Sequence, residues 1–146
     1  MRQGETDRMP GDAEIVARLA LACFLGVLIG LERRLTGHPA GERTFALVAL
    51  GACVFTVAGV VAGVDPTRVA AQVVTGIGFV CTGVIIHREG GVKGLTTAAS
   101  LWFAAAAGVA VGVGEYVLAS AATGLAVLVL LLDRVLPAIG ESPDRA

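Results

Sequence analysis

Five long apolar runs follow one another along the chain, and short polar stretches separate them. The apolar positions are consecutive and do not alternate with polar ones, a pattern typical of helices that cross a membrane. The sequence therefore predicts an all-α fold, a polytopic membrane protein whose bundle holds about five transmembrane helices. We expect these helices over residues 14–31, 44–64, 69–86, 95–114 and 116–132.

Polar segments flank this bundle at both ends. We expect a polar N-terminal tail over 1–13, a transmembrane domain over 14–136 and a polar C-terminal tail over 137–146. The N-terminal tail has no apolar region followed by a small-residue cleavage site, so the first apolar run is expected to stay as a membrane anchor. The connections are short, which predicts that consecutive helices are antiparallel neighbours.

The first apolar run is short for a membrane span. Its uninterrupted part, Leu19 to Leu31, has 13 residues, which cover ~20 Å of helix against a hydrocarbon core of ~30 Å. Either Arg18 extends outward to the interface, or Glu32 lies against protein at the other end. The sequence leaves both alternatives open.

Composition supports a membrane protein and excludes other classes. Hydrophobic residues make up 55% of the 146 residues, and the mean hydropathy is +0.81. A soluble core of this size cannot hide so much apolar surface. The net charge of −1 and the lack of a basic stripe exclude nucleic acid as a partner. Cys23, Cys53 and Cys81 lie in apolar runs without CxxC spacing, so we expect packing residues, with no metal site and no cofactor.

Charged residues predict the orientation. Seven of the eleven Lys and Arg residues fall at one end of the bundle: Arg33, Arg34, Arg43, Arg88, Lys93, Arg134 and Arg145. The other end receives Arg2, Arg8, Arg18 and Arg68. The positive-inside rule favours the first set in the cytoplasm, which puts the N-terminus outside and the C-terminus inside. We expect a multi-pass protein of the bacterial cytoplasmic (inner) membrane.

Glycines recur four residues apart within the runs, in the pairs Gly26 and Gly30, Gly59 and Gly63, and Gly108 and Gly112. Such pairs let helix backbones approach closely, although Gly is also simply common in membrane helices. Gln72 lies one turn before Gly76, with Gly78 beyond it. We expect this face to pack on another helix, with Gln72 donating a hydrogen bond across the contact.

The charged turn between the first two runs, "GLERRLTGHPAGERT", carries both signs. A carboxylate at a membrane end needs a partner or water, so we expect Glu32 to pair with Arg43, or with Arg33 as second choice. Thr44 and either Thr96 or Thr97 are expected to cap the second and fourth helices. These helix N-termini, with Arg43, Arg88 and Lys93, could form an anion or headgroup site. Lipid anchoring and topology alone are the alternative explanation of the charges.

Four blocks together carry a family resemblance: "GVLIGLERR", "GERTFALVALGACVF", "RVAAQVVTGIGFVCTGVI" and "REGGVKGLTTAASLWFAAAAGVAVGVG". In this order and spacing they resemble the MgtC/SapB membrane protein family. The resemblance implies about five spans and a link to magnesium-limited growth. It implies contacts with other membrane proteins, including the proton-translocating ATP synthase. Many members add a soluble C-terminal domain, for which we expect no room here, and virulence-associated members have Asn at the position of Thr96.

The sequence leaves three functions open. The first is a non-enzymatic regulator that binds other membrane proteins through Gly-rich helix faces, with a homo-oligomer as one further partner. The second is a small oligomeric transporter or channel, although the span interiors offer few ionisable groups for an ion path. The third is an enzyme, which His38 and His87 support poorly because no metal-ligand set surrounds them. Trp102 lies deep in the fourth run, where we expect it to pack on another helix or to line a cavity.

Overall fold

The computed structural model describes residues 10–38, 40–88 and 91–135, and it places five helices there. They are α1 (Asp12–Leu35), α2 (Glu42–Val61), α3 (Pro66–Val84), α4 (Leu95–Val113) and α5 (Tyr116–Val135). Four of them are long and apolar enough to cross a membrane, and α5 carries a shorter apolar stretch over Tyr116–Leu132. The predicted all-α membrane fold is confirmed.

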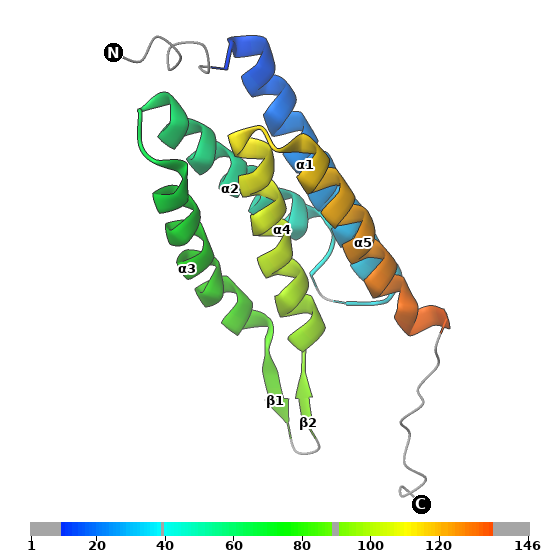
Figure 1. The fold of residues 1–146 in the computed structure, drawn as a ribbon. Helices are drawn as coiled ribbons and strands as arrows, with labels where there is room; N and C mark the ends of the chain where they lie inside the picture. The colour runs from blue at the N-terminus through cyan, green and yellow to red at the C-terminus, as the bar shows by residue number, and fades with distance from the viewer. Residues whose placement is uncertain (1–9, 39, 89–90, 136–146) are drawn as a thin grey trace, which may run out of the picture.

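The helices alternate in direction, so the chain begins at one end of the bundle and leaves α5 at the other (Figure 1). The turns α2–α3 and α4–α5 share the end at which α1 begins. The turn α1–α2 and the connection α3–α4 share the opposite end, as the predicted topology requires.

The connection between α3 and α4 contains an element that the sequence did not predict. Strands β1 (Ile86–Arg88) and β2 (Gly91–Lys93) form an antiparallel hairpin that extends beyond the helices (Figure 1). Gly94 follows with φ of +92°, a left-handed conformation that a side chain would strain. This glycine turns the chain from β2 into α4.

Helices α1, α2 and α4 form the core, and glycines set their spacing. A Cβ atom added at Gly26 would lie 2.6 Å from the carbonyl oxygen of Phe45, and one at Gly30 would lie 2.5 Å from Cα of Glu42. On the other side of α2, a Cβ at Gly108 would collide with the backbone carbonyl of Ala49. The predicted role of these glycines in close helix packing is confirmed, and α2 is held between two Gly-rich faces.

The third glycine pair behaves differently. A Cβ at Gly59 would lie 2.6 Å from Cγ2 of Val69, whereas Gly63 has open space around it and a φ of +72°. Gly63 therefore serves the turn after α2 and not helix packing. At this position the prediction was wrong, because the same spacing suits a helix pair and a helix end.

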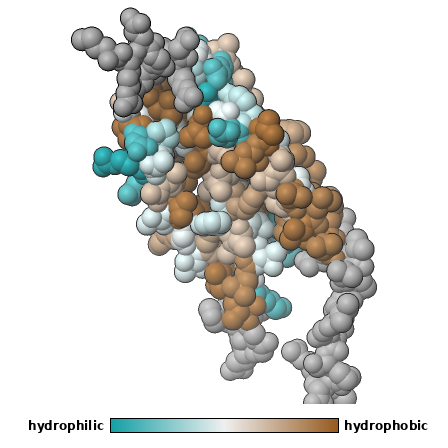
Figure 2. All heavy atoms as spheres, viewed as in Figure 1, coloured by the Kyte–Doolittle hydropathy of each residue, from teal (hydrophilic) through white to brown (hydrophobic). Residues whose placement is uncertain are grey.

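Helix α3 is peripheral. Only 6% of the most apolar 18-residue stretch of α3 is buried, against 56% of the corresponding stretch of α4. It packs mainly on α4 and meets α2 near the turn that joins the two helices, where Gly59 lies against Val69. Figure 2 shows apolar side chains over much of the visible face, with hydrophilic ones mainly towards the ends. This distribution suits a surface that faces lipid.

The structure moves the helix starts from their predicted places. Both α2 and α4 are preceded by glycine N-caps, Gly41 and Gly94, with no side-chain cap. Thr44 is the third residue of α2, and Thr96 and Thr97 are the second and third residues of α4. All three therefore lie inside the first helical turn, and the predicted threonine caps were wrong. A glycine N-cap satisfies the required backbone angles without a side-chain acceptor, and periodicity alone does not reveal it.

Candidate functional site

The end at which α1 begins holds a network centred on Arg18. Its Nε donates to the hydroxyl of Tyr116 at 3.0 Å, and its Nη1 donates to the backbone carbonyl of Gly112 at 2.6 Å. Its Nη2 forms an ion pair with Oε1 of Glu14 at 2.5 Å, and Tyr116 donates to the same oxygen at 2.8 Å. Arg18 is 7% exposed. The network joins α1, α4 and α5.

Arg18 is buried among protein groups towards the end of the bundle where α1 begins. That its side chain reaches the membrane interface, one of the two predicted alternatives, stays a prediction. Its guanidinium is satisfied by protein on several sides and lies 5.8 Å from the centre of the Tyr116 ring. Sequence reasoning missed this network. The spacing of Glu14 and Arg18, four residues apart on one helix, is the signal that indicated an ion pair. The partners from α4 and α5 depend on tertiary packing.

Glu32 and Arg33 form an ion pair at the opposite end of α1. Nε of Arg33 donates to Oε2 of Glu32 at 2.5 Å, and the two residues are 1% and 5% exposed, Arg33 being the more buried. Glu32 thus lies against protein, the second predicted alternative for the short first span. The predicted first choice of partner, Arg43, was wrong, and the second choice is the one observed.

Arg43 is exposed on α2, and no contact between it and Glu32 is found among the described residues. Its neighbour Glu42 pairs instead with Arg34, whose Nη1 lies 2.6 Å from Oε1 of Glu42. The helix begins at Glu42, so Arg43 and Glu42 point in different directions around α2. The turn is therefore held by two pairs, one buried and one near the surface.

Several buried polar atoms near this end have no partner within the described chain. They are Nη1 and Nη2 of Arg33, Oε1 of Glu32 and Oγ1 of Thr97. Thr97 is 1% exposed and lies in the first turn of α4. Buried polar atoms are nearly always hydrogen-bonded in folded proteins. Their occurrence around one helix start marks this region as a candidate site.

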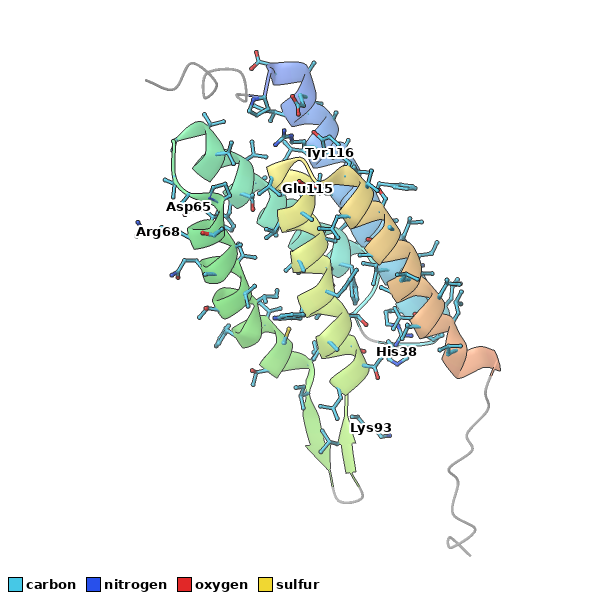
Figure 3. All side chains as sticks on the ribbon, viewed as in Figure 1. His38, Asp65, Arg68, Lys93, Glu115 and Tyr116 are labelled. Atoms are coloured by element: carbon cyan, nitrogen blue, oxygen red, sulfur yellow. The ribbon has the colours of Figure 1, made fainter. Side chains whose placement is uncertain are left out.

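The other residues predicted for an anion site lie farther out. Arg43, Thr44, Lys93 and Thr96 are exposed, and the side chain of Arg88 falls outside the described part of the chain. His38 and Lys93 lie towards the same end of the molecule (Figure 3), while Asp65, Arg68, Glu115 and Tyr116 lie towards the other. The structure thus confirms the shared end and supplies no contact that joins the exposed residues into one site.

A groove of ≈ 790 Å³ runs between α2 and α3. Its walls include Phe55, Gly51, Gln72 and Gly76, and Ala105 of α4 contributes to its floor. Gly51 and Gly76 have no atom within 4 Å of a built Cβ. The backbone of each wall is therefore accessible from the groove at these two glycines.

Two expectations about helix contacts were wrong for the single chain. Gln72 and Gly76 are exposed and line the groove, and no hydrogen bond from Gln72 to another helix is found among the described residues. Gly78 is also exposed with open space around it. Trp102 is 49% exposed and so neither packs deep in the bundle nor lines this groove. These residues face outward because α3 and one side of α4 have no covering helix.

Charged residues outside the helices contribute to the turns. Asp65 caps α3, and its Oδ1 accepts from the hydroxyl and the backbone N–H of Thr67, both at 2.8 Å. These hydrogen bonds hold the pKa of the Asp65 carboxyl below its usual range. Within the described ranges, no group of three His, Cys, Asp or Glu residues is placed to hold a metal ion.

The MgtC family model matches residues 19–138. This match covers most of the chain, including the glycine-packed core, the Glu32 end of α1 and the groove. The chain belongs to the MgtC family.

Curated relatives match much of this MgtC family member, and one of them has a name that mentions magnesium. A protein of Escherichia coli K12 named "Putative magnesium transporter YhiD" is 41% identical over 128 residues, covering 81% of this chain and 60% of its own length. Protein MgtC of Salmonella typhimurium LT2 is 48% identical over 109 residues, 74% of this chain and 47% of its own length. An uncharacterized protein of Haemophilus influenzae is 39% identical over 142 residues, 89% of this chain and 58% of its own length.

The MgtC family member described here spans roughly half to three fifths of the length of these relatives. The part that the family model matches holds the core, the Glu32 end of α1 and the groove. No solved structure matches the chain.

Proposed function

We propose that this MgtC family protein is a non-enzymatic regulator that binds another membrane protein in the α2–α3 groove. The observation that carries the proposal is the groove itself, open at Gly51 and Gly76 and placed along a helix that is almost unburied. Helices associate in lipid where small residues allow backbone approach and a polar side chain can donate across the contact. Gln72 supplies such a donor within the groove.

The proposed occupant is a transmembrane helix of a partner protein. An apolar ligand of any kind could enter the groove, but an amide buried in lipid gains from a partner that accepts its hydrogen bond. The backbone and polar side chains of a helix offer such acceptors, whereas acyl chains do not. By family resemblance, the proton-translocating ATP synthase is one candidate partner, and the role belongs to adaptation to magnesium limitation or stress.

Photocrosslinking tests the proposed docking. A photoreactive benzoylphenylalanine replaces Phe55, which lines the groove and is 66% exposed, or Phe79, which lies outside it and is 88% exposed. We expect a discrete protein adduct from position 55 in native membranes and none from position 79. Equal labelling from both positions would contradict docking in the groove, because it would indicate random collisions in the bilayer.

Transport is a second candidate function, favoured by one observation. An ion pair lies at each end of α1, Glu14 with Arg18 and Glu32 with Arg33, and the arginine of each pair is buried. Ionisable groups inside a membrane protein often mark ion paths. The purified chain in liposomes that contain a magnesium-sensitive dye separates the two functions. We expect no influx beyond that of empty liposomes, and a saturable influx would favour transport.

We propose a cytoplasmic-membrane location with the hairpin end inside, in keeping with the Lys and Arg distribution. Single cysteines are introduced at Arg43 and at Arg68, which are exposed near opposite ends, in a variant without Cys23, Cys53 and Cys81. A membrane-impermeant thiol reagent applied to intact cells is expected to label position 68 and to spare position 43. The reverse pattern would invert the orientation.

A further inference from the structure

Unpartnered buried donors gather where α1 ends and α4 begins. Arg33 holds Glu32 through Nε. Its Nη1 and Nη2 atoms and Oγ1 of Thr97 are buried and have no hydrogen-bond partner among the described residues. A buried donor without a partner destabilises the folded protein, and more so when it is charged. This cost indicates that another group completes the hydrogen bonds.

The antiparallel pairing of α1 with α4 places these donors at the same height along the bundle. Nη1 of Arg18 donates to the carbonyl of Gly112, and Ile29 shares a core cluster with Leu101. Both pairs follow the same antiparallel register. One turn farther along α1 from Ile29 is Arg33, and one turn back along α4 from Leu101 is Thr97. The guanidinium and the hydroxyl therefore approach the same start of α4.

The start of α4 is itself suited to an anion. Its N-cap is Gly94, which provides no side-chain oxygen for the first N–H groups of the helix. The first N–H groups of an α-helix have no partner inside the helix, and the helix dipole is positive there. Thr97, as the third helical residue, adds its hydroxyl to this end.

We propose that Arg33, Thr97 and the first turn of α4 bind a phosphate group, either free or in a phospholipid headgroup. The Nη1 and Nη2 atoms form the planar fork that matches two oxygens of a phosphate. The helix N–H groups and the Thr97 hydroxyl donate to the remaining oxygens. This proposal is independent of the groove and of any protein partner.

Thermal unfolding of the full-length, delipidated protein in detergent tests the site. The probes are inorganic phosphate, with chloride at equal ionic strength as its control, and short-chain phosphatidylglycerol, with a diacylglycerol of equal chain length as its control. We expect at least one phosphate-bearing probe to raise the melting temperature above its control. A rise with inorganic phosphate identifies free phosphate as sufficient, and a rise with the lipid alone identifies a headgroup.

Two isosteric variants show where the probe binds. Thr97→Val removes the proposed donor. Thr123→Val removes a hydroxyl on α5 that is equally buried and has no partner among the described residues. Without ligand, the two variants are therefore expected to be about equally stable. The half-saturating probe concentration is expected to rise on the order of tenfold for Thr97→Val and to stay unchanged for Thr123→Val. Arg33→Lys is expected to weaken binding at least as much, because it keeps the charge and loses the fork.

Glu32→Gln distinguishes a ligand site from a merely structural pair. The amide oxygen can still accept from Nε of Arg33, while the negative charge beside the phosphate is gone. We expect a lower melting temperature without probe but tighter phosphate binding. The proposal is overturned if neither probe stabilises the protein beyond its control, or if Thr97→Val and Thr123→Val respond equally. Either result would assign the free donors to buried water alone.

Discussion

The core of α1, α2 and α4 and the peripheral helix α3 use glycine in opposite ways. In the core, Gly26, Gly30 and Gly108 meet backbone atoms of a neighbouring helix, so no side chain fits. On α3, Gly76 and Gly78 meet nothing within 4 Å. Lipid provides no hydrophobic drive between helices, so close packing fixes the core, whereas the open glycines of α3 leave room for a second surface.

The largest effect is expected from breaking the buried ion pair at the end of the core. Arg33→Met leaves Glu32 buried without its partner, which costs about 3–5 kcal/mol of unfolding free energy. The double variant Glu32→Gln, Arg33→Met is expected to recover part of this loss. Arg43→Gln, on an exposed position of α2, is the matched control and is expected to stay within ~0.5 kcal/mol of the wild type.

Unfolding in mixed micelles measures the wild type, the single variants Arg33→Met and Glu32→Gln, their double variant and the control Arg43→Gln. If the losses of the two single variants simply add, Glu32 and Arg33 do not stabilise each other. If Arg43→Gln costs as much as Arg33→Met, the partner of Glu32 in the membrane is Arg43 and the assignment made here is wrong.

A glycine comparison sharpens the contrast between core and periphery. Gly30→Ala puts a Cβ 2.5 Å from Cα of Glu42, and such overpacking costs about 1–3 kcal/mol. Gly76→Ala has open space, and replacing a helical glycine there should stabilise by about 0.5–1 kcal/mol. The two substitutions are chemically identical and are expected to shift the melting temperature in opposite directions. A loss of stability in both would mean that α3 is packed as tightly as the core.

The amide of Gln72 separates stability from binding. In the isolated protein Gln72→Leu is expected to leave the melting temperature unchanged or slightly raised, because the amide is exposed and lines the groove. In membranes it is expected to weaken the partner adduct formed from position 55. The lost interhelical hydrogen bond corresponds to ~0.6–2 kcal/mol. A clear drop in the melting temperature would show instead that Gln72 binds within the chain.

The smallest effect concerns the cap of α3, at the start of the peripheral helix. The pKa of Asp65 is lowered by hydrogen bonds from Thr67, so the carboxylate stabilises the fold at neutral pH. This contribution is lost as pH falls below the ordinary value of 3.8 and through the lowered one. Asp65→Asn keeps an acceptor for Thr67, and its melting temperature is expected to depend less on pH in this acidic range. An identical pH profile would remove Asp65 from the account.

The sequence was sufficient to predict the membrane class, the five helices and the close approach at Gly26, Gly30 and Gly108, because each depends on local composition and spacing. It was insufficient for the partners of Arg18 and Glu32. Those depend on which helix ends meet in three dimensions, and a Glu beside three arginines offers several pairings of similar local plausibility. The exposure of Gln72 and Trp102 was also missed, since hydrophobicity does not distinguish a face towards lipid from a face towards another helix.

The central claim is that the groove beside α3 binds a partner that the core does not need for folding. Leucine at position 76 should fill the groove, whereas leucine at position 78 lies outside it, and both positions have open space. With the photoreactive residue at position 55, we expect Gly76→Leu to abolish the protein adduct and Gly78→Leu to retain it, with equal amounts of folded protein. Retention of the adduct in folded Gly76→Leu would contradict the account.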